Sequence, residues 1–296
     1  METEEVSKDT IIIIGNGFDV CHGLPSKYSD FKNWLQTNNK FLYETLNRYI
    51  DISGDWWNDF ERNLAAFNVP KLIHDAPKDY PSRDPRFPPS FYYPANGSFR
   101  NIRNQISESF TEWAQTLSCP STKPRVDIPA ADLCISFNYT DTLEKVYGIP
   151  ENHILYIHGK AVRDNELIFG HSKSHFELED ETKKKYNLYE SKSFFVPGTF
   201  GDAEYQLTLE ISFLDKFPYK QIVKYDSVLI PAVAVAKTIW VYGLSFSEVD
   251  FQYIEWITEK NPNLRWRVSW HVENDKKRIK NTFDALNVRE YEMFYL

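Results

Sequence analysis

Four short apolar runs of the sequence end on residues that could do chemistry. The segments that follow these runs are Gly15-Asn16-Gly17-Phe18-Asp19, Asn138-Tyr139-Thr140-Asp141, His158-Gly159-Lys160 and Gly243-Leu244-Ser245-Phe246-Ser247-Glu248-Val249-Asp250. In open α/β sheets, ligands bind at the carboxyl ends of the strands. Four such ends together predict a shared binding site more strongly than any single motif does.

The first of these segments predicts a loop that holds the phosphates of a nucleotide. A diphosphate approaches a backbone closely only where side chains are absent, and Gly15 and Gly17 provide that absence together with access to positive φ. The segment has Gly-x-Gly without the full Gly-x-Gly-x-x-Gly pattern, which is a weak fingerprint by itself. A tight turn between a strand and a helix is the alternative.

His158 is the candidate general base, because a neutral imidazole titrates near physiological pH. Gly159 directly after it would let a ligand approach closely. The alternative is a histidine that caps the strand end through a backbone hydrogen bond. Asn138 could orient a water molecule or a ribose hydroxyl, and an asparagine turn is the alternative for that residue.

The last segment carries two carboxylates that suit the hydroxyls of a ribose. Glu248 and Asp250 could hold an adenosine ribose, with Ser245 beside them. Ser247 is interpreted as the N-cap of the helix that follows.

Three other acidic residues are expected to have structural roles. Asp141 is expected to cap the helix that begins near Thr142, with Glu144 completing a capping box. Glu61 could face a cleft, and a surface helix carboxylate is the expected role.

The elements that must position these segments alternate between strands and helices. The predicted strands are Ile11–Ile14, Leu133–Phe137, Ile154–Ile157, Thr238–Tyr242 and Arg267–Val272, with a last strand at Glu290–Leu296. Most are apolar at both alternating positions, which is typical of strands buried on both faces of a parallel sheet. Helical spacing between them predicts a doubly wound, mostly parallel, Rossmann-like α/β fold.

Residues 1–296 are expected to form one domain with insertions at about 70–101 and 172–225. Pro70–Asn101 is rich in proline, aspartate, arginine and aromatic residues, which predicts an inserted loop that could act as a lid. Before it, Trp57 to Phe67 keeps helical spacing. After it, Ile102 to Leu117 is the clearest amphipathic helix of the chain. Ser172–Tyr225 contains a charge run typical of a solvated helix face.

Charge and cysteine content exclude several classes of protein. The net charge of −8 argues against a general nucleic-acid-binding surface, which is normally basic. Cys21, Cys119 and Cys134 are widely spaced and form no Cys-x-x-Cys pair. Neither a cysteine-rich zinc module nor a disulfide framework is therefore expected, and a reducing cytoplasm is the simplest location.

No metal and no membrane contact are expected either. His153 and His158 flank one predicted strand and would point to different ends of it, which argues against zinc ligation by the histidines at positions 153, 158, 171 and 175. The first ten residues lack the form of a signal peptide, and no apolar run approaches the ~20 residues of a membrane span.

Six motifs occur in order along the chain. They are IIGNGFDVCHGLPSKYSDF, WWNDFE, SFNYTDTLEKVYG, IHG, IFGH and YGLSFSEVDFQYI. This set resembles the bacterial phage abortive-infection AbiH family from near residue 11 to the C-terminal region. The resemblance implies a role in defence, in which infected cells stop growing or die before phage can spread.

The same order is similar to sirtuin-like NAD-binding domains, with a glycine loop, an asparagine loop, a catalytic His-Gly and a late Gly-x-Ser. The similarity implies NAD contacts at Gly15, Asn16, Gly17, Phe18, Asp19, Gly243 and Ser245, and catalytic roles for Asn138 and His158. The neighbouring residues Tyr139, Gly159, Glu248 and Asp250 complete the expected binding set. The first loop departs from the Gly-Ala-Gly of sirtuins, and Asp19 would repel a phosphate unless it faces a ribose or a helix N-terminus. The four-cysteine zinc module of sirtuin deacetylases cannot be built here, which counts against protein deacetylation.

The leading hypothesis is a defence effector that hydrolyses the nicotinamide–ribose bond of NAD. His158 would act as base on water or a ribose hydroxyl, and Asn138 would position it. Such an enzyme must stay silent until infection, so an activating phage component, a partner protein or a homo-oligomer is expected. The alternatives are a non-catalytic nucleotide sensor and a metal-dependent nuclease with acidic residues such as Asp19, Glu61, Glu248 and Asp250.

Overall fold

The computed structural model describes residues 9–76, 92–162, 167–171, 177, 180–181, 184, 200–210 and 218–296. The chain divides into two compact units. The first contains residues 1–27, 111–168 and 218–296, and the second contains residues 28–110 and 169–217. The single domain with two insertions that the sequence suggests stays a prediction.

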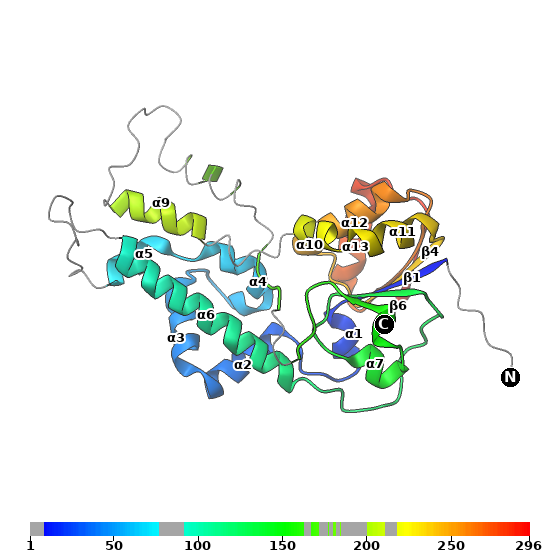
Figure 1. The fold of residues 1–296 in the computed structure, drawn as a ribbon, viewed down its shortest axis with the longest axis horizontal. Coiled ribbons are helices and arrows are strands. Elements are labelled where there is room, and N and C mark those ends of the chain that lie inside the picture. The colour runs from blue at the N-terminus through cyan, green and yellow to red at the C-terminus, as the bar shows by residue number, and fades with distance from the viewer. Residues whose placement is uncertain are drawn as a thin grey trace. The chain divides into compact units, whose positions relative to one another are not determined.

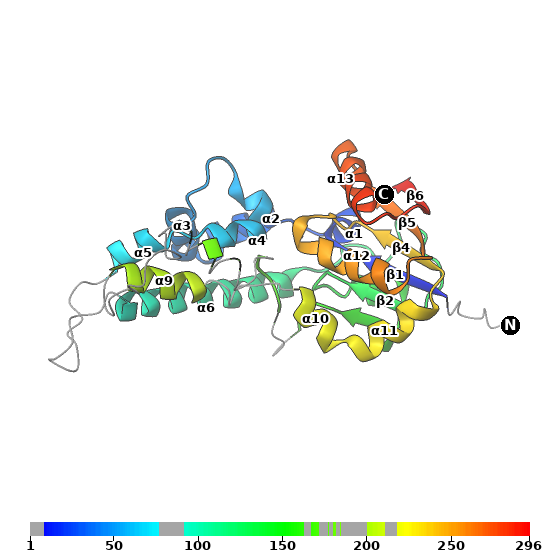
Figure 2. The same ribbon diagram turned by 90° about the horizontal axis from the view of Figure 1, so that it is seen from above.

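The first unit is built on a sheet of six strands in the order β3-β2-β1-β4-β5-β6. The strands are β1 (Thr10–Ile14), β2 (Leu133–Ser136), β3 (Ile154–Tyr156), β4 (Thr238–Tyr242), β5 (Arg265–Trp270) and β6 (Tyr291–Tyr295). All five neighbouring pairs are parallel, and Figure 2 shows the strands side by side from β6 to β2. This confirms the predicted doubly wound α/β fold. The fifth strand begins two residues earlier than predicted.

Both faces of the sheet are buried because the strands are apolar at both alternating positions. Ile11 and Ile13 enter one core, whereas Ile12 and Ile14 enter the other. All four side chains are at most 2% exposed, and burial of each contributes about 1.5–3 kcal/mol.

Helices cover the two faces unequally (Figure 1). One face packs against α10 (Pro218–Lys224), α11 (Asp226–Val235), α12 (Glu248–Lys260) and α13 (Glu273–Ala285). The other face packs against the short helices α1 (Asn16–Cys21) and α7 (Thr142–Tyr147).

The second unit is helical and has an aromatic core. Its elements are α2 (Tyr28–Asn38), α3 (Lys40–Tyr49), η1 (Trp56–Asp59), α4 (Phe60–Asn63), η2 (Leu64–Ala66), α5 (Val69–Asp75), α6 (Tyr92–Thr116, of which residues to 110 belong here) and α9 (Phe200–Glu210). Phe31 lies at the centre, with its ring centroid 5.4 Å from that of Phe110 and 5.5 Å from that of Phe60.

Two local predictions for this unit are wrong. The helix expected from Trp57 to Phe67 is divided into η1, α4 and η2, because the Asn63 side chain donates to the Trp56 carbonyl and the indoles of Trp56 and Trp57 stack 4.2 Å apart. The loop expected over 70–101 is helical at both ends. Pro70 fits the first turn of α5, which Asn68 caps by accepting from the Lys71 N–H. Residues 77–91, the middle of the segment expected to form a lid, lie outside the described residues.

The turns after β1 and β4 are in backbone contact. The N–H of Gly15 donates to the Tyr242 carbonyl at 2.9 Å, and the N–H of Gly17 donates to the Gly243 carbonyl at 2.8 Å. A Cβ on Gly243 would lie 2.1 Å from the Phe18 nitrogen, and this residue has a φ of +64°. Only glycine fits at position 243, so this contact fixes the two turns against each other.

We expect Gly243→Ala to lower the free energy of unfolding by about 3 kcal/mol or more, because it adds both left-handed strain and a backbone clash. Gly97→Ala is the matched control, since a Cβ there meets no atom within 4 Å and Gly97 lies inside helix α6. That change should be neutral or stabilising by up to about 1 kcal/mol. Chemical denaturation measures both effects, and equal stabilities for the two variants would contradict the prediction.

Candidate functional site

The carboxyl edge of the first unit's sheet is where its predicted site residues gather. The strand order 3-2-1-4-5-6 reverses direction between β1 and β4, and ligands of open α/β sheets bind at such a switch point. The four predicted segments follow β1, β2, β3 and β4 in the structure. The side chains of Asp19, His158 and Asp250 in these segments belong to separate hydrogen-bonded groups.

The glycine turn of the first segment is closed by the protein itself. The N–H of Gly17 donates to Gly243, and the N–H of Phe18 donates to Gly15 at 2.9 Å. Phe18 is fully buried, and its ring centroid lies 4.5 Å from that of His22. Asn16 is exposed. Gly15 and Gly17 thus permit the close approach of the turn after β4, at Gly243, rather than that of a ligand.

Asp19 is the most buried carboxylate group of this edge. It is 1% exposed and accepts from the Thr140 hydroxyl at 2.6 Å and the Thr142 hydroxyl at 2.8 Å. Burial raises its pKa to about 6, against the opposing effect of these hydroxyl donors. The sequence analysis did not predict a role for either threonine hydroxyl. The signal was the spacing of Thr140 and Thr142, two residues apart after Asn138, which lets both hydroxyls reach one partner.

Asn138 connects the second segment to the first. It is buried, and its side-chain amide donates to the Gly15 carbonyl at 3.0 Å. Its own N–H donates to the Ser136 hydroxyl at 3.2 Å. These bonds hold the amide at the end of β2, beside the glycine turn.

His158 lies in an aromatic setting at the end of β3. Its imidazole is fully buried, with Nε2 at 3.0 Å from the Tyr253 hydroxyl of α12. The Phe137 ring lies edge-on to the imidazole at a centroid distance of 5.2 Å. Gly159 has a φ of +90° and turns the chain at this point. The sequence analysis did not identify Tyr253 as a partner of His158.

The capping box predicted at α7 is wrong. Asp141 stands at the N-cap position without a side-chain cap, and it pairs with Lys145 at 3.0 Å. Glu144 accepts instead from the Lys160 ammonium at 2.7 Å and from the Tyr156 hydroxyl at 2.8 Å. The positive charge of Lys160 therefore draws Glu144 toward the loop after β3.

The segment after β4 makes a group around Asp250. This carboxylate is buried and accepts from the Ser245 hydroxyl at 2.6 Å and from the Ser247 hydroxyl at 3.2 Å. Ser247 is the N-cap residue of α12, as predicted, but without a side-chain cap. Glu248 is exposed. Tyr139, the last predicted contact, donates from its hydroxyl to the Ile168 carbonyl at 2.8 Å.

In the second unit, Glu61 is buried rather than a surface carboxylate, so that prediction is wrong. Its Oε1 lies 3.4 Å from the Gly170 N–H, which donates to it. The next residue, His171, is 1% exposed. The sequence signal that could have indicated this is the position of Glu61 directly after the aromatic residues Trp56, Trp57 and Phe60.

Within the described ranges, no group of three or more His, Cys, Asp or Glu side chains could hold a metal ion. Among the same residues, none of the helices combines the length and apolar character that a membrane span requires.

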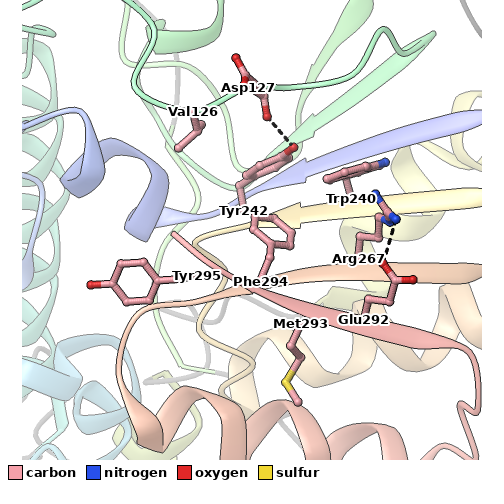
Figure 3. Close-up of a pocket in the computed structure, with 9 residues that line it drawn as sticks. All are labelled: Val126, Asp127, Trp240, Tyr242, Arg267, Glu292, Met293, Phe294 and Tyr295. Carbon is pink, nitrogen blue, oxygen red and sulfur yellow. Dashed lines mark hydrogen bonds and ion pairs between the residues drawn. The ribbon is translucent and has the colours of Figure 1, made fainter.

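A cavity of about 460 Å³ lies on the sheet face that α1 and α7 cover only in part, and Figure 3 shows its lining residues. It is lined by Val126, Asp127, Trp240, Tyr242, Arg267, Glu292, Met293, Phe294 and Tyr295. The Arg267 guanidinium lies 4.7 Å above the Trp240 ring and pairs with Glu292 at 2.8 Å. None of the predicted site residues lines this cavity.

We expect Asp19 to make stability depend on pH. Its pKa in the folded protein lies above the ordinary value of 3.8, so the folded state binds a proton more readily. The free energy of unfolding should then fall by up to about 3 kcal/mol as pH rises from about 4 to about 6. Asp19→Asn should remove this decrease, whereas Asn in place of the exposed Asp132 should keep it. Parallel stability curves for wild type and Asp19→Asn would contradict the prediction.

Comparison with known proteins agrees with the resemblance seen in the motifs. The family model described as Bacteriophage abortive infection AbiH matches residues 11–270. No curated protein matches the chain. The matched range begins in β1 and runs through β5, so it includes all four segments at the carboxyl edge of the sheet. The chain belongs to the AbiH family and has a role in bacteriophage abortive infection.

Proposed function

We propose that this protein is an abortive-infection effector that binds NAD and hydrolyses its nicotinamide–ribose bond. The observation that carries the proposal is that Asn138 and His158 follow the neighbouring strands β2 and β3, with the Asn138 amide bonded to the turn after β1. An amide and an imidazole at one sheet edge supply the two functions that hydrolysis needs, which are orientation and proton transfer.

The reaction would break the bond between C1′ of the ribose and the nicotinamide nitrogen. Nicotinamide leaves as a neutral molecule with the bonding electron pair, and the water oxygen adds to C1′ of the oxocarbenium-like centre. The water proton passes to the His158 imidazole and then to solvent. The products are ADP-ribose, nicotinamide and one proton, so the step balances without a metal or an oxidant.

The fixed hydrogen bonds of the site support this division of roles. Because the Asn138 amide donates to the Gly15 carbonyl, its oxygen is held in one direction and could accept from a ribose hydroxyl or water. The Tyr253 hydroxyl at Nε2 holds the His158 ring in one orientation. Asp19 acts through Thr140 and Thr142, which it fixes beside Asn138; it is a positioning residue.

The glycine turn after β1 and the Ser245 hydroxyl limit how a nucleotide could bind. The N–H groups of Gly17 and Phe18 already donate to carbonyls of the protein. A diphosphate would therefore have to approach beside the glycine turn, at the exposed Asn16. Ser245 is exposed while bound to Asp250, and this hydroxyl–carboxylate pair suits a ribose diol.

We expect purified, activated protein to release nicotinamide from NAD, and His158→Gln to reduce the rate by at least about 100-fold, because a general base contributes that much. Glutamine keeps a polar group toward Tyr253. His153→Gln is the matched control, since His153 stands at the opposite end of β3 and should leave the rate unchanged. Mass spectrometry of the nucleotide pool measures the product.

Equal rates for wild type and His158→Gln, with both proteins folded by circular dichroism, would refute the catalytic role of His158. No turnover of NAD by any form, together with saturable NAD binding, would point to the second candidate.

The second candidate is a non-catalytic sensor that binds a nucleotide and signals to a partner. The complete burial of the His158 side chain and its bond to Tyr253 favour it. A toxic phenotype in infected cells that survives His158→Gln would support this role. The metal-dependent nuclease is favoured less, because Asp19 and Asp250 belong to separate hydrogen-bonded groups.

A further inference from the structure

Strand β6 forms one edge of the sheet and lacks two residue types, proline and lysine, that often protect an edge. It is last in the strand order, and in the described part of the chain no strand pairs with its outer side (Figure 2). Its sequence, Tyr-Glu-Met-Phe-Tyr, contains neither proline nor lysine. Met293 is 37% exposed and Tyr295 is 63% exposed. Such an edge is a template for pairing with another strand.

The hydrogen bonds of β5 and β6 show which backbone groups face outward. The Leu296 N–H donates to the Trp270 carbonyl, and the Glu290 carbonyl accepts from the Trp266 N–H, both at 2.9 Å. Even-numbered residues therefore direct their N–H and C=O groups toward β5. Because these directions alternate along a strand, Tyr291, Met293 and Tyr295 direct theirs outward.

We propose that β6 pairs antiparallel with β6 of a second copy of this chain, across a twofold axis at Met293. This register places Met293 opposite its counterpart and Tyr291 opposite Tyr295 of the second copy. Every outward N–H and C=O group of the strand then has a partner, since directly opposed residues exchange both hydrogen bonds. The two sheets become one continuous sheet.

The side chains select this register over its neighbours. Glu292 is placed opposite Phe294 of the second copy, and each Tyr291 meets a Tyr295 in an aromatic cross-strand pair, which stabilises by about 0.2–1 kcal/mol. A shift of two residues that places Tyr291 opposite Met293 would put Glu292 opposite its own counterpart. Like charges directly opposed are destabilising, and fewer backbone groups would be paired.

The ion pair of Glu292 supports the same arrangement. Glu292 is bound to Arg267 on the inner side of the strand, toward β5. Its charge is therefore compensated on the face of the cavity in Figure 3 while the outer backbone stays available. Glu292 and Phe294 lie on this face, so the open faces of the two copies would continue into each other.

Sedimentation of the purified full chain tests the pairing, and we expect wild type to contain a dimer whose fraction rises with protein concentration. Met293→Pro should shift the equilibrium to monomer by at least tenfold in dissociation constant. Proline removes the outward N–H of residue 293 and no bond to β5. Met293→Val keeps that N–H and should remain dimeric. A monomeric wild type, or a Met293→Pro variant that is folded and still dimeric, would refute the proposal.

Disulfide trapping tests the register independently of folding effects at proline. Opposed residues of a hydrogen-bonded antiparallel pair have Cα atoms about 5.5 Å apart, within the range that a disulfide bridges. Met293→Cys should therefore form a covalent dimer under mild oxidation. Tyr295→Cys should not, because its counterpart lies several residues away along the strand. The wild-type chain, with its three cysteines, is the background control. Trapping at 295 and not at 293 would overturn this register.

Discussion

The arrangement of the first unit depends on the contact between two backbone turns, at Gly17 and Gly243. The two glycines approach so closely that a side-chain carbon on Gly243 would lie 2.1 Å from the Phe18 nitrogen. This contact extends the pairing of β1 and β4 into the two turns at the switch point of the sheet. It also fixes the Gly15 carbonyl, which accepts from the Asn138 side chain. The position of Asn138 therefore depends on the glycine contact.

A second constraint holds the other side of the same edge. Asp19 is buried with two threonine hydroxyls from the turn after β2, and its burial without a cationic partner in this group keeps its pKa near 6. A carboxylate in such surroundings costs folding energy at neutral pH. In return, the bonds of Asp19 to the two threonines hold α1 against the segment that carries Asn138.

The sequence predicted the sheet well because its signal is local. Strands buried on both faces are apolar at every position, as Ile11–Ile14 shows, and polar residues mark their ends. The partners of the polar residues were harder to predict. Whether Glu144 caps a helix or binds Lys160 depends on where the β3 loop returns, and the contact of His158 with Tyr253 joins residues 95 positions apart. The cavity beside Trp240 depends on the strand order and on which sheet face the helices cover. No single sequence motif could therefore predict it. Glu61 illustrates the same limit, since its burial depends on residues 109 positions away.

The proposed function assigns the cleavage of NAD to Asn138 and His158, at the ends of β2 and β3. The most direct test is the NAD content of phage-infected cells that express either wild type or Asn138→Ala at equal protein levels. We expect NAD to fall after infection in the wild-type cells, with a matching rise in nicotinamide, and to stay constant with Asn138→Ala. Unchanged NAD in infected wild-type cells that nevertheless stop growing would contradict it.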